Sequence, residues 1–208
     1  MAEEASSGKR QAILSAAERV FDAHGYAAAT MDAVAQHAGT SKGSLYNYFR
    51  NKRDLFTQLF AAMLAGDEAA ADQLVNEPIP ATEKLHRFTD NWFDRLTHFT
   101  RVGRLTLEFW ATAAREEGRG ELSAAFAKMY DRGRRRIEAI LTEGIEAGQF
   151  RPDIDVSIAG PLILSVFNGI IVQSILDVGA EFDASYLNAL KHGLVASLSS
   201  WASTGQSQ

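Results

Sequence analysis

The side chains best suited to chemistry lie close together between residues 40 and 54. Four basic residues fall in this window against one acid, Asp54. Lysine and hydroxyl groups bind phosphate oxygens, and serine, asparagine and lysine side chains can also bond to base edges. The pattern predicts contact with DNA, and the candidate contacts are Thr40, Ser41, Lys42, Gly43, Ser44, Tyr46, Asn47, Tyr48 and Lys52.

The expected roles of these residues differ. Gly43 carries no side chain, so the backbone can approach DNA closely there. Base edges would be read by Ser44 and Asn47, and by Lys42 if it faces guanine. Phosphates would be held by Lys42, Lys52 and the hydroxyls of Thr40, Tyr46 and Tyr48. In the alternative interpretation the segment is an ordinary helical hairpin, with Tyr46, Tyr48 and Phe49 packed in its core.

The distribution of charge favours the first interpretation. The chain of 208 residues has a net charge of −5. Residues 1–65 nevertheless carry 7 Lys and Arg against 6 Asp and Glu, whereas residues 66–208 carry 14 against 20. A locally basic patch on an acidic protein is compatible with phosphate binding, which depends on the local potential.

Two short helices are expected to position the candidate residues as a helix-turn-helix. Thr30 and Ser41 are suited to cap the two helices, and Gly39 is suited to the turn between them. Val34 and Leu45 would be buried between the helices. The second helix would then project its first side chains into the major groove of DNA.

Helical periodicity and a lack of strand-like alternation predict an all-α protein with about nine helices. The first helix should stop at Gly25, and the helix-turn-helix helices follow. Pro161 should kink its helix or delay its start, because its ring would clash with the Ser157 carbonyl. The remaining helices are expected from about residue 52 to Val75 and over 82–99, 103–116, 120–147, 155–178 and 183–201.

The stretch from Arg10 to Phe60 resembles the N-terminal domain of TetR/AcrR-type repressors. Thr40 stands where that family commonly has an apolar residue, and Asn168 stands where it commonly has an Asp. The resemblance rests on Ile13-Leu14-x-Ala16-Ala17-x-x-x-Val20-Phe21, Gly25-Tyr26, Thr30-Met31-x-x-Val34-Ala35, Ala38-Gly39-x-Ser41-x-Gly43-Ser44-Leu45-Tyr46-x-Tyr48-Phe49 and Asn51-Lys52-x-x-Leu55, and more weakly on Gly144-x-x-x-Gly148-x-Phe150-Arg151-x-Asp153 and Asn168-Gly169.

This resemblance implies a flexible tail over residues 1–8, a helix-turn-helix DNA-binding domain over 9–52 and a ligand-binding and dimerisation domain over 53–208. It also implies an apolar ligand cavity in the second domain, where large side chains crowd together. Each aromatic residue could equally be ordinary core. The expected cavity residues are Trp92, Leu96, Leu107, Trp110, Met129, Tyr130, Phe167, Asn168 and Gln173, which suit a hydrophobic or aromatic effector.

Apolar residues at helical spacing on the last two helices predict a homodimer interface. Two wide stripes exceed what one protomer would normally cover, and a two-fold dimer would match a palindromic operator. The expected interface residues are Leu162, Val166, Gly169, Leu187, Leu190, Leu194, Leu198 and Trp201. The basic run Arg132–Arg136 is instead expected to be a solvated, salt-bridged face.

Other classes of protein find less support. The chain has no cysteine, and its five histidines are scattered without metal-ligand spacing, so no metal, cofactor or catalytic site is expected. Residues 1–8 do not resemble a signal peptide, and the run around 158–176 contains polar residues, so a cytoplasmic protein without a membrane span is expected. The leading hypothesis is a ligand-responsive repressor. An architectural DNA-binding protein and a ligand-binding or enzymatic bundle without DNA function are the alternatives.

Overall fold

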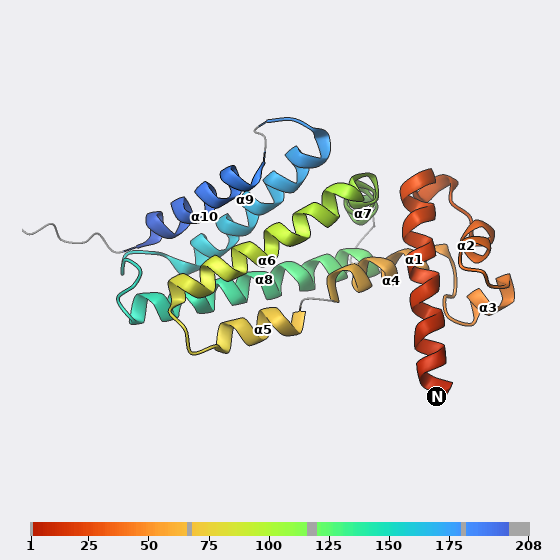
Figure 1. Ribbon diagram of the computed structural model, residues 1–208, viewed down its shortest axis with the longest axis horizontal. Helices are drawn as coiled ribbons and strands as arrows, with labels where there is room; N and C mark the ends of the chain where they lie inside the picture. The colour runs from red at the N-terminus through yellow and green to blue at the C-terminus, as the bar shows by residue number, and fades with distance from the viewer. Residues whose placement is uncertain (1, 66–67, 116–119, 180–181, 200–208) are drawn as a thin grey trace, which may run out of the picture. The chain divides into compact units, whose positions relative to one another are not determined.

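The computed structural model describes residues 2–65, 68–115, 120–179 and 182–199, without the side chains of residues 2–5, 64–65, 69 and 95–101. These ranges form helices and contain no strand beyond an isolated bridge between Phe150 and Ser199, which confirms the all-α prediction (Figure 1). The helices are α1 (Ala2–Ala28), α2 (Met31–His37), α3 (Lys42–Tyr46), α4 (Lys52–Ala65), α5 (Glu68–Asn76), α6 (Ala81–Arg101), α7 (Gly103–Arg115), α8 (Glu121–Glu146), α9 (Val156–Leu176) and α10 (Ala184–Leu198).

The first helix differs from expectation at its start and agrees with it at its end. α1 begins at Ala2, so residues 2–8, which were predicted to belong to a flexible tail, are helical. Acidic residues at positions 3 and 4 suit the positive end of the helix dipole, which favours this extension. Regular helical geometry breaks at Gly25, where φ is 75° and ψ is 160°. Positive φ favours glycine, so the predicted stop at Gly25 is confirmed.

Two other predicted helices agree only in part with the structure. The predicted fourth helix, ending near Val75, falls on α4, which ends at Ala65, and on α5, which begins at Glu68. Residues 66 and 67 lie outside the described part of the chain, so a continuous helix there stays a prediction. α9 begins at Val156, capped by Asp155, and continues through Pro161, so the predicted later start is wrong, whereas the alternative of a kink stays a prediction. Near the helix start this proline removes only one backbone bond, the one to the Ser157 carbonyl.

The helices fall into two compact units, and the predicted domain boundary at residue 52 lies within the first of them. The first unit comprises residues 1–66 and 101–127. Within it, α1 packs against α2, α4 and α7. Its core contains a chain of aromatic rings: Phe56 lies 4.3 Å from Phe109, and Phe60 lies 4.9 Å from Phe109 and 4.2 Å from Phe126, measured between ring centroids. The segment 101–127 is therefore part of the core around α1 and α4.

The second unit comprises residues 67–100 and 128–208. Its core joins α6, α8, α9 and α10 through Leu85, Ile137, Phe150, Phe167 and Leu198, among others. A buried lysine on α6 strengthens this packing. The Lys84 ammonium bonds to Glu143 on α8 at 2.6 Å and to the Val75 carbonyl at 2.8 Å, so it is paired despite its burial.

Candidate DNA-reading surface and effector pocket

The helix-turn-helix is built by local capping. The Thr30 hydroxyl accepts a hydrogen bond from the Ala33 amide at 3.1 Å, and the Ser41 hydroxyl accepts one from the Ser44 amide at 3.2 Å. Gly39 forms the turn with a φ of 63°. Val34 and Leu45 are buried, as expected for two helices that cross closely. Ser41 thus starts α3, and its hydroxyl is occupied by the cap.

A polar face of α3 is exposed. Lys42, Gly43, Tyr46 and Asn47 are all exposed, and Ser44 is half-buried. A Cβ atom added at Gly43 would meet no atom within 4 Å, so nothing inside the protein requires glycine there. The absence of a side chain matters only to something that approaches α3 from outside, which agrees with the predicted close approach of DNA.

The three aromatic residues of this segment have different environments. Phe49 is fully buried, whereas Tyr46 is 44% exposed. Tyr48 is half-buried, and its hydroxyl accepts a hydrogen bond from the Ser6 hydroxyl at 3.5 Å. The alternative in which all three form a hairpin core therefore fits only Phe49. Thr40 is half-buried with its hydroxyl oxygen buried and without a hydrogen-bond partner in the described part of the chain.

The ammonium group of Lys42 already has an acidic neighbour. Asp32, in the first turn of α2, lies 2.8 Å from Lys42 Nζ, and both side chains are exposed. The hydrogen bond from Lys42 to Asp32, together with the charge of Asp32, raises the lysine pKa. Exposed pairs of this kind contribute little energy. Lys42 can therefore exchange Asp32 for a DNA phosphate at low cost.

Lys52 has partners that the sequence did not indicate. Its Nζ donates to the carbonyl oxygens of Tyr26 at 2.7 Å, Ala27 at 3.1 Å and Ala29 at 3.0 Å, and it lies 4.7 Å from the centre of the Tyr26 ring. An ammonium group has three N–H donors, so all are used. Lys52 clamps the chain just after the break at Gly25, and its role as a phosphate contact stays a prediction.

Sequence reasoning also missed a network beside α3. The Asp54 carboxylate accepts from the Arg50 amide at 2.8 Å and from the Gln58 side chain at 2.9 Å. Burial raises the pKa of Asp54, whereas these hydrogen bonds and the charge of the Arg50 guanidinium lower it. The lowering effects together outweigh burial, so the pKa of Asp54 lies below its ordinary value. Arg50 also lies 3.4 Å from Glu121 at the start of α8. The network fixes the beginning of α4 directly after α3.

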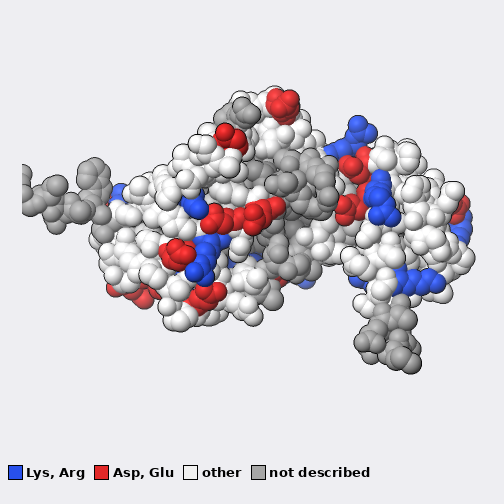
Figure 2. Space-filling model, in the orientation of Figure 1, with Lys and Arg blue, Asp and Glu red and all other residues white. Residues whose placement is uncertain are grey.

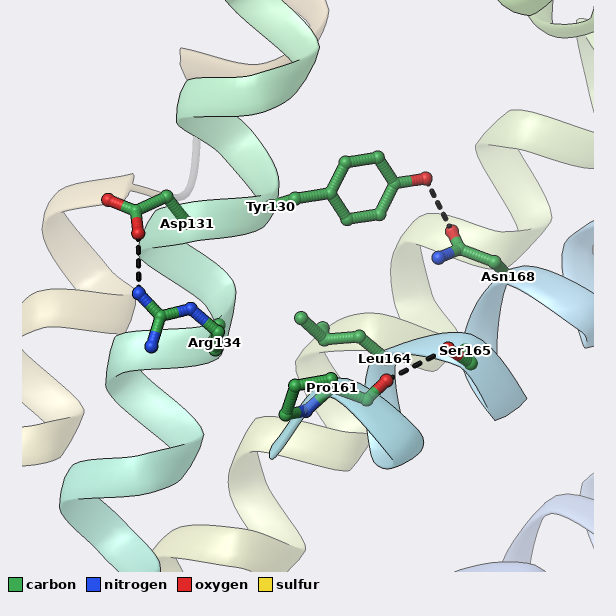
Figure 3. Close-up of a pocket in the computed structure, with 7 residues that line it drawn as sticks. All are labelled: Tyr130, Asp131, Arg134, Pro161, Leu164, Ser165 and Asn168. Carbon is green, nitrogen blue, oxygen red and sulfur yellow. Dashed lines mark hydrogen bonds and ion pairs between the residues drawn. The ribbon is translucent and has the colours of Figure 1, made fainter. Parts of the chain in front are cut away.

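A pocket of about 340 Å³ lies between α8 and α9 in the second unit. Figure 3 shows its arrangement: Tyr130 and Asn168 face each other on one side, and the Asp131–Arg134 ion pair lies on the other. The Tyr130 hydroxyl donates to Asn168 Oδ1 at 3.1 Å. The lining residues are Tyr130, Asp131, Arg134, Pro161, Leu164, Ser165 and Asn168, which join apolar walls to a polar rim.

The predicted effector residues are only partly gathered at this pocket. Tyr130 and Asn168 line it, whereas Trp92 and Phe167 stack in the core with ring centroids 4.5 Å apart. Gln173 is exposed. The other predictions are placed as follows: Met129 is half-buried beside Tyr130, Leu107 and Trp110 lie on α7 in the first unit, and the side chain of Leu96 lies outside the described residues.

The other residues that line the pocket were not predicted from the sequence. Arg134 belongs to the basic run that is expected to be a solvated, salt-bridged face, with Asp131 beside it, and Pro161 is expected only to kink its helix or delay its start. A usable signal is their spacing: Pro161 and Ser165 lie four residues apart on one helix, and Tyr130 and Arg134 four apart on the other. Residues at this spacing share a helix face.

The predicted dimer residues divide between exposed and buried positions. Leu162 and Val166 are 60% and 43% exposed, and Ile158, one turn earlier on α9, is 64% exposed. Leu198, by contrast, is buried in the core of its own protomer, which removes it from the predicted interface. The remaining predictions, Gly169, Leu187, Leu190 and Leu194, are half-buried, and Trp201 lies outside the described residues.

The arginine run on α8 is salt-bridged, as predicted. Arg132 and Arg136 both bind Glu68 of α5, at 2.7 and 2.8 Å. Arg134 and Arg135 pair with Asp131. Figure 2 shows acidic and basic side chains interspersed on the visible face rather than separated by sign. The run therefore joins helices of the second unit.

Comparison with known proteins assigns both halves of the chain. Residues 13–59 match the family model "Bacterial regulatory proteins, tetR family", and residues 81–199 match "BetI-type transcriptional repressor, C-terminal". The chain is 30% identical over 147 residues to the uncharacterized HTH-type transcriptional regulator YhgD of Bacillus subtilis, covering 71% of this chain and 74% of that protein.

Other similar proteins have more informative names. The fatty acid metabolism regulator protein of Bacillus subtilis is 26% identical over 160 residues, which cover 77% of this chain and 80% of that protein. The crystal structure of FadR from Bacillus subtilis in complex with stearoyl-CoA shares the fold, with a TM-score of 0.68, 23% identity and coverage of 91% and 97% of the two chains. With both halves matched, the chain belongs to the TetR family of bacterial transcriptional regulators.

Proposed function

We propose that this protein is a homodimeric repressor that binds a palindromic operator and releases it when an amphipathic effector binds. The exposed polar face of α3 carries the DNA-binding part of the proposal. Lys42, Gly43, Tyr46 and Asn47 stand on a helix capped by Ser41 and held beside buried Leu45. A short, rigid helix that presents such side chains is what major-groove reading requires.

The surface of α9 supports a dimer. α9 has no charged residue, its mean hydropathy reaches 1.8, and by length and composition it could cross a membrane. Ile158, Leu162 and Val166 recur one turn apart on it and are exposed. A second copy of the chain would cover this stripe, and a two-fold arrangement would place two α3 helices about 34–36 Å apart for successive major grooves.

The identity of the effector is inferred from two observations. The pocket between α8 and α9 combines Leu164 and Pro161 with a polar rim. Relatives include a regulator of fatty acid metabolism and a FadR structure with stearoyl-CoA. A molecule with a hydrocarbon part and a polar head fits both. Such an effector would act by binding the DNA-free state of the repressor more tightly than its DNA-bound state.

Selection of bound sequences from a random DNA pool tests this proposal. The expected product is an inverted repeat whose half-site centres are about one helical turn apart. Lys42→Ala should weaken binding to it, and an exposed arginine of the second unit, replaced in Arg87→Ala, serves as the matched control. Recovery of no preferred sequence, or of many unrelated sites, would favour an architectural role and contradict the repressor.

A further inference from the structure

We propose that the α8–α9 pocket recognises an uncharged carbonyl group of its effector, such as a thioester, ester or amide, through the side-chain amide of Asn168. This inference rests on the proposed ligand-responsive function and specifies its chemistry. A ligand that ends in a free carboxylate is correspondingly disfavoured.

The first argument is the orientation of Asn168. Its Oδ1 accepts the hydrogen bond from the Tyr130 hydroxyl at 3.1 Å, so the NH₂ group remains to face the pocket (Figure 3). That NH₂ group forms no hydrogen bond with any other residue in the described part of the chain. An NH₂ group only donates hydrogen bonds, so its ligand partner must be an acceptor such as a carbonyl oxygen.

The hydrogen bond from Tyr130 keeps the Asn168 amide in this orientation. Burial raises the pKa of the Tyr130 phenol, and the hydrogen bond to Asn168 opposes this only in part. The phenol therefore stays protonated near neutral pH and continues to donate. Because Tyr130 is on α8 and Asn168 is on α9, the two helices together fix the direction of the amide.

The second argument concerns charge on the opposite rim. Among the described residues that line the pocket, Arg134 is the only cation, and its guanidinium bonds to Asp131 at 2.7 Å and to Glu138 at 2.8 Å. Asp131 also pairs with Arg135 at 2.8 Å. Two carboxylates thus match two guanidinium groups, which leaves no net positive charge for an anionic head group. Burying a carboxylate without such a partner is costly.

The third argument is the remaining wall. Leu164 and Pro161 form an apolar side below the amide (Figure 3). The hydroxyl of Ser165 donates to the Pro161 carbonyl of its own helix at 2.9 Å, so it is already satisfied. The pocket therefore offers one directed donor above an apolar wall, which matches a carbonyl attached to a hydrocarbon chain.

The test measures binding of two probes to the full-length protein by isothermal titration calorimetry. Decanoyl-N-acetylcysteamine thioester and decanoate carry the same acyl chain, but only the second is charged. We expect the thioester to bind about tenfold more tightly or better, because the carboxylate of decanoate would lose water without gaining a cationic partner. Equal binding, tighter binding of decanoate, or binding of neither probe would overturn the proposal.

Three variants then locate the contact. Asn168→Asp still accepts from Tyr130 but turns an oxygen toward the pocket, so thioester affinity should fall about tenfold. Tyr130→Phe frees the amide to rotate and should cost about threefold. Ser165→Ala is the matched control and should change neither affinity. Thermal denaturation confirms folding of each variant, and an Asn168→Asp protein that folds and binds the thioester as before contradicts the assignment.

Operator binding, followed by fluorescence anisotropy on the same preparations, separates the two proposals. A protein that binds its operator but shows no preference for the thioester retains the repressor function and loses the carbonyl site. A protein that prefers the thioester but binds no operator loses the repressor function instead.

Discussion

At the level of single side chains, Lys42 and Lys52 carry the same charge but have different partners. Lys42 is exposed and paired with one exposed acid, whereas Lys52 donates to three backbone carbonyls. The sequence could identify Lys42 by its place in α3. It could not reveal the role of Lys52, because the carbonyls come from residues 26–29 and converge only after the chain folds.

This difference predicts opposite results for two substitutions. Lys42→Ala should lower the salt dependence of operator binding by about one counterion, because a phosphate contact is lost. Lys52→Met should leave that slope unchanged but destabilise the protein by about 2 kcal/mol, because three carbonyls lose their donor. Urea denaturation and anisotropy titrations at several salt concentrations measure both effects. A lower salt dependence of operator binding, with normal stability, in Lys52→Met would show that Lys52 does contact a phosphate.

At the level of helices, the glycines show which structural features could be predicted from the sequence and which could not. Gly25 and Gly39 end helices at positive φ, a local property that the sequence shows directly. Gly144 on α8 is different, because a Cβ atom there would overlap the Phe150 ring. The pairing of Gly144 with Phe150 depends on how the chain returns after α8, so only the structure reveals it.

A pair of alanine substitutions separates these kinds of glycine. Gly144→Ala should displace Phe150 from the core and destabilise the protein by about 2 kcal/mol. Gly43→Ala meets no atom within 4 Å, so it should leave stability unchanged or slightly improved, yet weaken operator binding. Denaturation curves and operator titrations of both variants provide the check. A destabilised Gly43→Ala protein would mean that Gly43 serves the fold.

The contact of α6 with α10 predicts a dependence on pH. Burial lowers the pKa of His86, and Lys191 and His192 lower it further, against the opposing effects of Glu83 and Asp90. The rings of His86 and His192 lie 5.3 Å apart. As the pH falls, His86 takes up a proton in the unfolded chain at a higher pH than in the folded protein. The free energy of unfolding should therefore decrease as the pH drops below about 6.5, the ordinary histidine pKa, and through the lower pKa of the folded state.

His86→Gln should reduce this loss of stability between pH 7 and pH 5. The measurement is the thermal midpoint across that range, and His24→Gln, at an exposed position on α1, is the control. Equal pH dependence in His86→Gln and the unmodified protein would show that His86 does not cause it.

At the level of the whole molecule, α9 shows how far composition can be interpreted. Its apolar character was visible in the sequence and suggested an interface. The sequence could not show which α9 residues belong to the core of the protomer and which to a dimer interface, because both environments favour apolar side chains. In the structure Phe167 and Ile163 are buried in the protomer, whereas Leu162 and Val166 are exposed.

The proposed dimer gives the prediction at this scale. Leu162→Glu places a charge on the exposed stripe and should yield a monomer with unchanged helical content and much weaker operator binding. Light scattering with size-exclusion chromatography gives the mass, and circular dichroism gives the helicity. Ser157→Glu, at an exposed position outside the stripe, is the control. A Leu162→Glu protein of the same mass as the unmodified one would remove this stripe from the interface.

The aromatic contacts of the first unit have a consequence for protein engineering. Phe109 and Phe126 complete the packing around Phe56 and Phe60, although they come from much later in the chain. A fragment that ends at residue 66 would leave both earlier rings open to water, a loss comparable to deleting core side chains. The DNA-binding helices therefore cannot be separated from the rest of the chain by a cut at the end of α4. A chimera that transplants it to another sensor must bring the segment 101–127 along.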